Sequence, residues 1–145
     1  MKPKVRVKNI IVISSIITAL GLLVIFDHQR VTNDLISLRG DLMRIRFNTI
    51  TENNSVIVRF NGNEMSVLDF KTKDLIEAKK YPTINGVSYD TKIGKSMIVF
   101  HRGTTELFNE RVHGGEIGLK SWFGFEKYLH VNCAGFVSEG RYPEA

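Results

Sequence analysis

The chain opens with an apolar run that has the length and composition of a membrane span. Residues 10–26 (IIVISSIITALGLLVIF) carry no charge. As a helix they extend about 26 Å, slightly less than the ~30 Å hydrocarbon core of a bilayer. The run is apolar on every face, whereas a helix on the surface of a small soluble domain has one polar side. We therefore expect a membrane anchor, with its lipid-facing residues represented by Ile10, Ile13, Ile17, Leu20, Leu23 and Phe26.

Charges on the two sides of this run predict its orientation. Four basic residues precede it and Asp27 follows it. Because positive charges stay on the cytoplasmic side, the N-terminus is expected inside and the rest of the chain outside. A cleaved signal peptide shares the basic start and the apolar run, but residues 24–28 (VIFDH) lack the small residues of a cleavage site. The pattern favours an uncleaved anchor.

After Phe26 the apolar residues change to the spacing of an amphipathic helix. They recur at steps of four and three residues, which places them on one face. Polar residues such as Asp34, Arg39, Asp41 and Arg44 are expected on much of the opposite surface. No proline occurs between Pro3 and Pro82, so one helix is predicted over about residues 9–50. The expected packing seam consists of Val31, Leu35, Leu38, Leu42 and Ile45.

The seam could pack against the same helix of a second copy, as a coiled coil, or against the chain's own downstream domain. Barely two heptads are present, fewer than the three or four that indicate a coiled coil. Packing against the chain's own downstream domain is therefore favoured over dimerisation through the helix. The polar residues 51–54 (TENN) should end the helix.

Beyond residue 54 the pattern becomes that of short strands. A hairpin is predicted where residues 56–60 and 65–70 flank the turn 61–63 (NGN). Strands of this length at spacings near ten residues predict an antiparallel sheet or sandwich. The fold class is therefore α+β, a long N-terminal helix packed on a small antiparallel β domain. The remaining expected strands are residues 73–80 at an edge, 87–90 after Asn85-Gly86, 97–101, 106–109, 116–120, 127–131 and 136–138.

The chain divides into four parts on these patterns. Residues 1–9 form a basic cytoplasmic flank and residues 10–26 the transmembrane helix. Residues 27–51 continue the helix with an amphipathic pattern, and residues 52–145 form the β-rich domain.

Composition changes this picture in one respect, since the net charge of +5 suggests a nucleic-acid ligand. Four of the twenty basic residues precede the apolar run, which leaves sixteen Lys and Arg against fifteen Asp and Glu beyond it. A nearly neutral domain disfavours phosphate binding, which needs clustered positive charge. Only Arg102, Arg111 and Arg141 would form a local patch, if their loops converge.

Candidate chemistry is sparse. None of the four histidines has a His or Cys partner at metal-ligand spacing, and no nucleophile, Walker or dinucleotide motif occurs. We expect no enzymatic activity, no cofactor and no metal. Cys133 is the only cysteine, so no intrachain disulfide can form. It is expected to be buried as a small apolar residue, with an intermolecular disulfide or a reactive thiol as the alternative.

The layout and several short runs resemble the type IV pilin-like proteins, in particular the minor pilins and pseudopilins of the GspH/FimT type. In that group a strand and turn ending in glycine precede an I-x-L strand and a final hairpin. The matching runs here are residues 98–100 (IVF), 102–105 (RGTT), 115–119 (GEIGL), 128–132 (YLHVN), 135–137 (GFV) and 140–141 (GR). The resemblance implies a structural subunit of a type II secretion or type IV pilus system. It also implies a bacterial inner-membrane location, a periplasmic β domain, and other pilin-like subunits and membrane lipid as partners.

The N-terminus departs from this family. A prepilin leader ends in Gly, and the mature chain continues with Phe and a Glu five residues in. The corresponding stretch, residues 7–11 (VKNII), has neither feature, and no acidic residue precedes Asp27. Leader cleavage and N-methylation therefore cannot be transferred, nor can the charge that pairs with a neighbouring subunit's N-terminus. The alternative function is a membrane-anchored binding protein that reuses the fold, with DNA uptake as one example.

Overall fold

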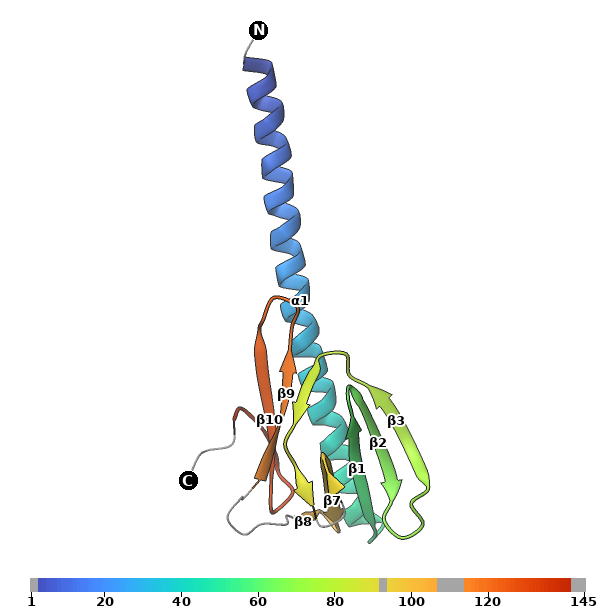
Figure 1. The fold of residues 1–145 in the computed structure, drawn as a ribbon. Coiled ribbons are helices and arrows are strands. Elements are labelled where there is room, and N and C mark those ends of the chain that lie inside the picture. The colour runs from blue at the N-terminus through green and yellow to red at the C-terminus, as the bar shows by residue number, and fades with distance from the viewer. Residues whose placement is uncertain (1–2, 92–93, 107–113, 142–145) are drawn as a thin grey trace.

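The described residues form one long helix, two main antiparallel sheets and a small two-stranded ribbon (Figure 1). The computed structural model describes residues 3–91, 94–106 and 114–141. Helix α1 spans Pro3–Thr51 without interruption, which confirms the single helix that the sequence predicts. Proline suits the first helical position because its missing N–H has no helical partner there. The helix ends before Asn53, whose φ of 52° is the left-handed conformation common beyond helix ends.

The strands form two main sheets and one small ribbon. The five-stranded sheet has the order β3-β2-β1-β7-β8, the four-stranded sheet has the order β11-β10-β9-β4, and β5 pairs with β6. All pairings are antiparallel, as the expected fold class requires. The strands are β1 Ser55–Asn61, β2 Glu64–Asp69, β3 Leu75–Lys80, β4 Ile84–Val87, β5 Asp90–Thr91, β6 Gly94–Lys95, β7 Met97–His101, β8 Thr104–Glu106, β9 Gly114–Lys120, β10 Glu126–Asn132 and β11 Val137–Glu139.

Local sequence signals place the first hairpin correctly. Strands β1 and β2 pair from Val56↔Asp69 to Asn61↔Glu64, which confirms the predicted turn. Gly62 supplies the positive φ of 59° that the turn needs. Strand β3 lies at the edge of its sheet, where a charged strand was expected.

Two expected strands differ from the structure. Asn85-Gly86 does not precede a strand but lies inside β4, at a register shift opposite Gly118 of β9. The chain then leaves this sheet, and β5 begins only at Asp90. Of the strand expected at 106–109, Glu106 belongs to β8 and residues 107–109 lie outside the described residues.

A single core joins the helix to both sheets. It contains the helical seam together with inward-facing side chains of β1, β7, β9 and β10. Phe100, Ile117, Leu129 and Val131 are all fully buried in it. A second, smaller cluster of Ile57, Leu68 and Val99 covers the opposite face of the five-stranded sheet. The β domain thus has a core that is incomplete without the second half of α1.

Cys133 is exposed, so its expected burial is wrong. It lies in the turn between β10 and β11, where its carbonyl accepts a hydrogen bond from Thr105 N at 3.0 Å. The sequence also predicts a turn at residues 133–135. Turns lie at the surface because their backbone groups need water or local partners.

Candidate functional site

The N-terminal half of α1 projects beyond the β domain as an uncovered apolar rod (Figure 1). Within the described residues, one helix has the length and hydropathy to cross a membrane. All six predicted anchor residues are exposed, with fractions from 51% to 64%. These residues are Ile10, Ile13, Ile17, Leu20, Leu23 and Phe26.

The second half of α1 carries the predicted seam into the core. Val31, Leu35, Leu38, Leu42 and Ile45 are each between 0% and 3% exposed. Helix α1 contacts strands of both sheets along this seam, namely β7, β9, β10 and β11. The structure therefore brings these five residues together against the chain's own domain.

Acidic side chains attach one flank of the helix to the domain. The carboxylate of Asp34 accepts hydrogen bonds from Thr83 N at 3.1 Å and Thr83 Oγ1 at 2.6 Å. Asp41 accepts from Lys79 Nζ at 2.7 Å and from the Tyr81 hydroxyl. These contacts place two helical acids directly over the segment that joins β3 to β4.

Asp41 and Tyr81 perturb each other's ionisation. Burial alone would raise the pKa of Asp41, but hydrogen bonds from Lys79 and Tyr81 and nearby positive charge hold it below its usual value. Burial, followed by the hydrogen bond to Asp41, raises the pKa of the Tyr81 hydroxyl. At neutral pH a carboxylate accepts from a neutral phenol, which is a strong charge-assisted arrangement.

Arginines attach the other flank. Arg39 NH1 lies 3.3 Å from Glu139 Oε1 of β11. Arg46 Nε donates to Gly103 O at 2.8 Å, and its guanidinium carbon lies 4.4 Å from the centroid of the Phe136 ring. The helix is therefore held on both sides of the seam by polar contacts from different strands.

Those contacts correct the expected distribution of polar residues. Asp34, Arg39 and Asp41 were expected on the surface opposite the seam, but they flank it and bind the domain. Arg44 does the same through Glu77 Oε1, 2.7 Å from its NH2. Long polar side chains at the edges of a seam reach the neighbouring strands, which a count of helical positions does not reveal.

The outward face of the same half carries apolar residues that the sequence reasoning missed. Their positions differ by seven, four and three, which aligns them on one side of the helix. Their exposed fractions range from 46% to 65%. We call this set the outer stripe: Ile36, Met43, Phe47 and Ile50. The signal was present in the sequence as a second helical periodicity, rotated from the first.

The junction between the two halves of α1 is fixed by Asp27. Its carboxylate is fully buried and accepts hydrogen bonds from Trp122 N at 3.2 Å and Phe123 N at 2.9 Å. Arg30 NH2 lies 3.3 Å from Asp27 Oδ1. These donors come from the turn between β9 and β10, which Figure 1 shows beside α1 at the end of the β domain nearest the N-terminal half. From the sequence, Asp27 was expected only to mark the outer end of the anchor and so its orientation.

The electrostatics of this junction favour a charged carboxylate. Burial alone would raise the pKa of Asp27. Hydrogen bonds from Phe123, the Ser121 hydroxyl and Trp122, together with the charge of Arg30, outweigh burial and lower the pKa below its usual value. The carboxylate is therefore ionised at neutral pH, and protein donors surround it.

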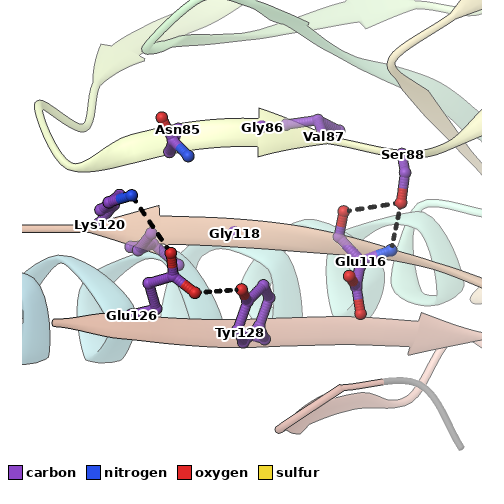
Figure 2. A pocket seen from close by; sticks show the side chains of 10 residues that line it. Asn85, Gly86, Val87, Ser88, Glu116, Gly118, Lys120, Glu126 and Tyr128 are labelled. Carbon is purple, nitrogen blue, oxygen red and sulfur yellow. Dashed lines mark hydrogen bonds and ion pairs between the residues drawn. The ribbon is translucent and has the colours of Figure 1, made fainter. Parts of the chain in front are cut away.

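A hollow lies on the outer face of β4, β9 and β10 (Figure 2). Tyr128 OH donates to Glu126 Oε2 at 2.7 Å, and Lys120 Nζ lies 3.3 Å from Glu126 Oε1. These hydrogen bonds, with Tyr128 first and Lys120 next, lower the pKa of Glu126. A general acid would need the opposite shift. The hollow is lined by Asn85, Gly86, Val87, Ser88, Glu116, Gly118, Leu119, Lys120, Glu126 and Tyr128.

The three arginines of the predicted basic patch have different surroundings. Arg102 lies in the turn after β7, where its backbone N–H donates to Asn54 O at 3.2 Å. Arg141 NH2 donates to Tyr128 OH at 2.7 Å, and the hydrogen bond together with nearby carboxylates raises its pKa. Arg111 lies outside the described residues. Arg141 therefore lies among acidic side chains, which weakens any attraction for phosphate.

Within the described residues no group of three or more His, Cys, Asp or Glu side chains could hold a metal ion. No match is found for this chain among protein-family models, curated proteins or solved structures. A long apolar N-terminal helix packed on antiparallel sheets is compatible with a pilin-like fold. Membership of the pilin-like family stays a prediction.

Proposed function

We propose that this protein is a non-enzymatic structural subunit, similar to the minor pilins and pseudopilins. Its α1 would anchor it in the bacterial inner membrane, with the N-terminus cytoplasmic and the β domain periplasmic. Through α1 it would contact other pilin-like subunits of a type II secretion or type IV pilus machine. The fold supports this proposal because one uninterrupted helix serves first as an apolar rod and then as part of the domain core.

The observation that carries the proposal is the outer stripe. Beyond the expected membrane span a helix that only had to hold its own domain would present polar residues to water. Here Phe47 is 65% exposed and Ile36 is 60% exposed. Removing apolar surface from water stabilises association by roughly 25 cal/mol per Å². Side chains spaced by three, four and seven residues are those that interlock between packed helices.

The stripe also discriminates between functions. An anchored enzyme or ligand-binding domain would need its chemistry on the β domain and would have no use for an apolar face on the helix. A subunit that packs its helix against neighbouring helices needs such a face along the whole length of α1. The exposed anchor residues and the outer stripe together supply it.

Cysteine crosslinking in native membranes tests the proposal. Phe47→Cys would be introduced into a chain carrying Cys133→Ser, so that the new thiol is the only one. A thiol-reactive crosslinker should then join position 47 to a second membrane protein, identified by mass spectrometry. We expect that partner to be another helix-anchored subunit of a secretion or pilus machine.

The neighbouring position supplies a matched control. Asn48 is also exposed but points about 100° away from Phe47 around the helix. Asn48→Cys in the same background should give little of this product. Equal crosslinking from both positions, or none from Phe47→Cys, would contradict assembly through the outer stripe.

A further inference from the structure

The turn between β9 and β10 exposes large aromatic side chains. It contains Ser121, Trp122, Phe123, Gly124 and Phe125 (SWFGF), and we call it the aromatic turn. Trp122 is 71% exposed and Phe123 is 52% exposed. A cluster of exposed aromatic side chains in one tight turn indicates an interaction surface, whereas single exposed apolar residues are common and need no such explanation.

The position of this turn identifies what it meets. Asp27, which binds the backbone of Trp122 and Phe123, directly follows Phe26, the last residue of the apolar run. One residue of helix corresponds to about 1.5 Å along the axis. The exposed rings therefore lie at the level where the candidate membrane-spanning segment ends.

The backbone N–H groups of the turn are hydrogen-bonded within the protein, as a region poor in water requires. Ser121 N donates to Phe125 O at 2.9 Å, and Phe125 N donates to Ser121 Oγ at 2.8 Å. Gly124 N donates to Ser121 O at 3.3 Å. With Trp122 N and Phe123 N held by Asp27, all five backbone N–H groups have protein acceptors. Transfer toward lipid then leaves no backbone donor of this turn unsatisfied, which would otherwise cost several kcal/mol per group.

The neighbouring charges suit a membrane–water boundary. The guanidinium carbon of Arg30 lies 3.7 Å from the centroid of the Trp122 ring. The ring of His28 meets that of Phe125 edge-on, with centroids 5.1 Å apart. Tryptophan is enriched at membrane–water interfaces, and a long cationic side chain keeps its charged end in the aqueous layer there. Asp27, the acid that holds the turn, is fully buried. Glu126, at the base of the turn, is exposed and forms an ion pair with Lys120 at 3.3 Å.

The length of the anchor points the same way. A run of seventeen uncharged residues gives about 26 Å, less than the ~30 Å hydrocarbon core. A short span draws the flanking residues toward the bilayer. No linker separates the span from the domain, because α1 is continuous to Thr51. The aromatic turn, as the part of the domain joined to Asp27, is drawn in with it.

We propose that the aromatic turn inserts into the lipid interface of the leaflet on the domain side. The partner is the bilayer surface itself, and the turn sets the height of the domain above it. This inference rests on the membrane anchoring proposed above and adds a second point of attachment to it. Asp27 acts as a positioning residue, since it holds the turn against the helix.

Fluorescence provides a direct test because Trp122 is the only tryptophan in the chain. The full-length protein would be reconstituted into phosphatidylcholine vesicles whose acyl chains carry bromine at different depths. Trp122 emission should be quenched several-fold by bromine near the headgroups and less by bromine near the bilayer centre. Acrylamide in the water should quench it weakly.

A second variant moves the probe away from the membrane. Phe136 is 57% exposed and lies beside Arg46, nineteen positions along α1 from Asp27, or about 28 Å. In the double variant Trp122→Phe, Phe136→Trp, emission should be insensitive to brominated lipid and open to acrylamide. Equal lipid quenching in both proteins would overturn the proposal, as would a Trp122 signal quenched only from water.

Flotation of the same vesicles separates this inference from the anchor. A chain that floats with lipid after carbonate washing, but whose Trp122 is not quenched by bromine, retains the anchor and overturns the inserted turn. A chain that does not float overturns both. A chain that floats and is quenched near the headgroups supports both.

Discussion

At the scale of single residues, Asp27 joins two segments that lie about ninety-five positions apart in the sequence. Its carboxylate is buried, charged and bonded to the backbone of Trp122 and Phe123. The same residue terminates the apolar run. One side chain therefore connects the membrane-facing part of the helix to the end of a β hairpin.

Asp27→Ala should lower the stability of the folded domain. The substitution leaves two backbone donors and Arg30 without their acceptor, and unsatisfied buried donors are costly. We expect a lower urea midpoint for the detergent-solubilised full chain, followed by circular dichroism, and greater acrylamide quenching of Trp122. The exposed Asn33, changed to Ala, is the control and should leave both measurements unchanged. An Asp27→Ala protein that behaves like this control would contradict the assigned role.

Two glycines of β9 provide a second residue-scale prediction. A Cβ on Gly115 would lie 1.9 Å from Ser88 O, a backbone atom that cannot move aside easily. A Cβ on Gly118 would have its nearest neighbour at 3.4 Å, the side chain of Tyr128. Gly115→Ala should therefore reduce the free energy of unfolding by about 1–3 kcal/mol or more. Gly118→Ala should change it by less than about 0.5 kcal/mol. Urea titrations of both variants check the difference, and equal values would refute the close approach.

At the scale of elements, α1 has two apolar faces with different tasks. The seam is buried in the core, and the outer stripe is exposed. Both have helical spacing, so periodicity alone cannot say which of them meets the sheets. Both span fifteen residues, but the seam has five apolar residues at steps of three and four, whereas the stripe has four and is interrupted at Gly40. The seam is therefore the clearer pattern in the sequence. The stripe became visible only when the packing of the domain left it uncovered.

Paired substitutions distinguish the two faces. Leu38 is fully buried, so Leu38→Ala should cost about 2–5 kcal/mol of unfolding free energy through lost contacts and a cavity. Ile36 is 60% exposed, so Ile36→Ala should change stability by less than about 0.5 kcal/mol. Urea unfolding measures both. Crosslinking in membranes should respond differently from stability. Ile36→Ala should weaken crosslinking from position 47, although the protein remains folded. A large stability loss for Ile36→Ala would indicate that the stripe packs within the chain.

At the scale of the whole molecule, carboxylates on α1 tie the helix to both sheets. Asp27 and Asp41 each have a pKa below the usual value near 3.8 because of hydrogen bonds and nearby cations. A depressed folded-state pKa contributes stability that is complete above the unfolded-state value. That contribution is lost as the pH falls through the folded-state pKa.

Acid should therefore loosen the helix from the domain. We expect the urea midpoint to stay level from pH 7 to about pH 5 and to fall progressively below pH 4. The double variant Asp27→Asn, Asp41→Asn should begin with a lower midpoint and lose less of it on acidification. If the urea midpoint of the double variant falls with pH as steeply as that of the unsubstituted protein, Asp27 and Asp41 do not control the acid sensitivity.

The sequence predicted the parts of the fold that depend on local pattern. Helix α1, the β1–β2 hairpin and the edge position of β3 follow from periodicity, turn residues and charge. The missed features depend on contacts between distant segments. Asp27 needs the β9–β10 turn, and the polar flanks need Thr83 and Glu139. No spacing rule links such positions, so their roles emerge only from the assembled structure.

The uninterrupted helix has a geometric consequence, since it fixes the rotational phase between anchor and domain. Each residue turns an α-helix by about 100°. One alanine inserted between Phe26 and Asp27 would swing the lipid-facing surface by that angle relative to the outer stripe. Seven inserted residues would nearly restore the original direction. A one-residue insertion should therefore abolish joint contacts made by the two halves. A seven-residue insertion should move the domain about 10 Å farther from the anchor along the helix axis and nearly preserve its rotation about that axis. The number of residues between the anchor and Asp27 therefore determines how the lipid-facing surface is rotated about the helix axis relative to the β domain.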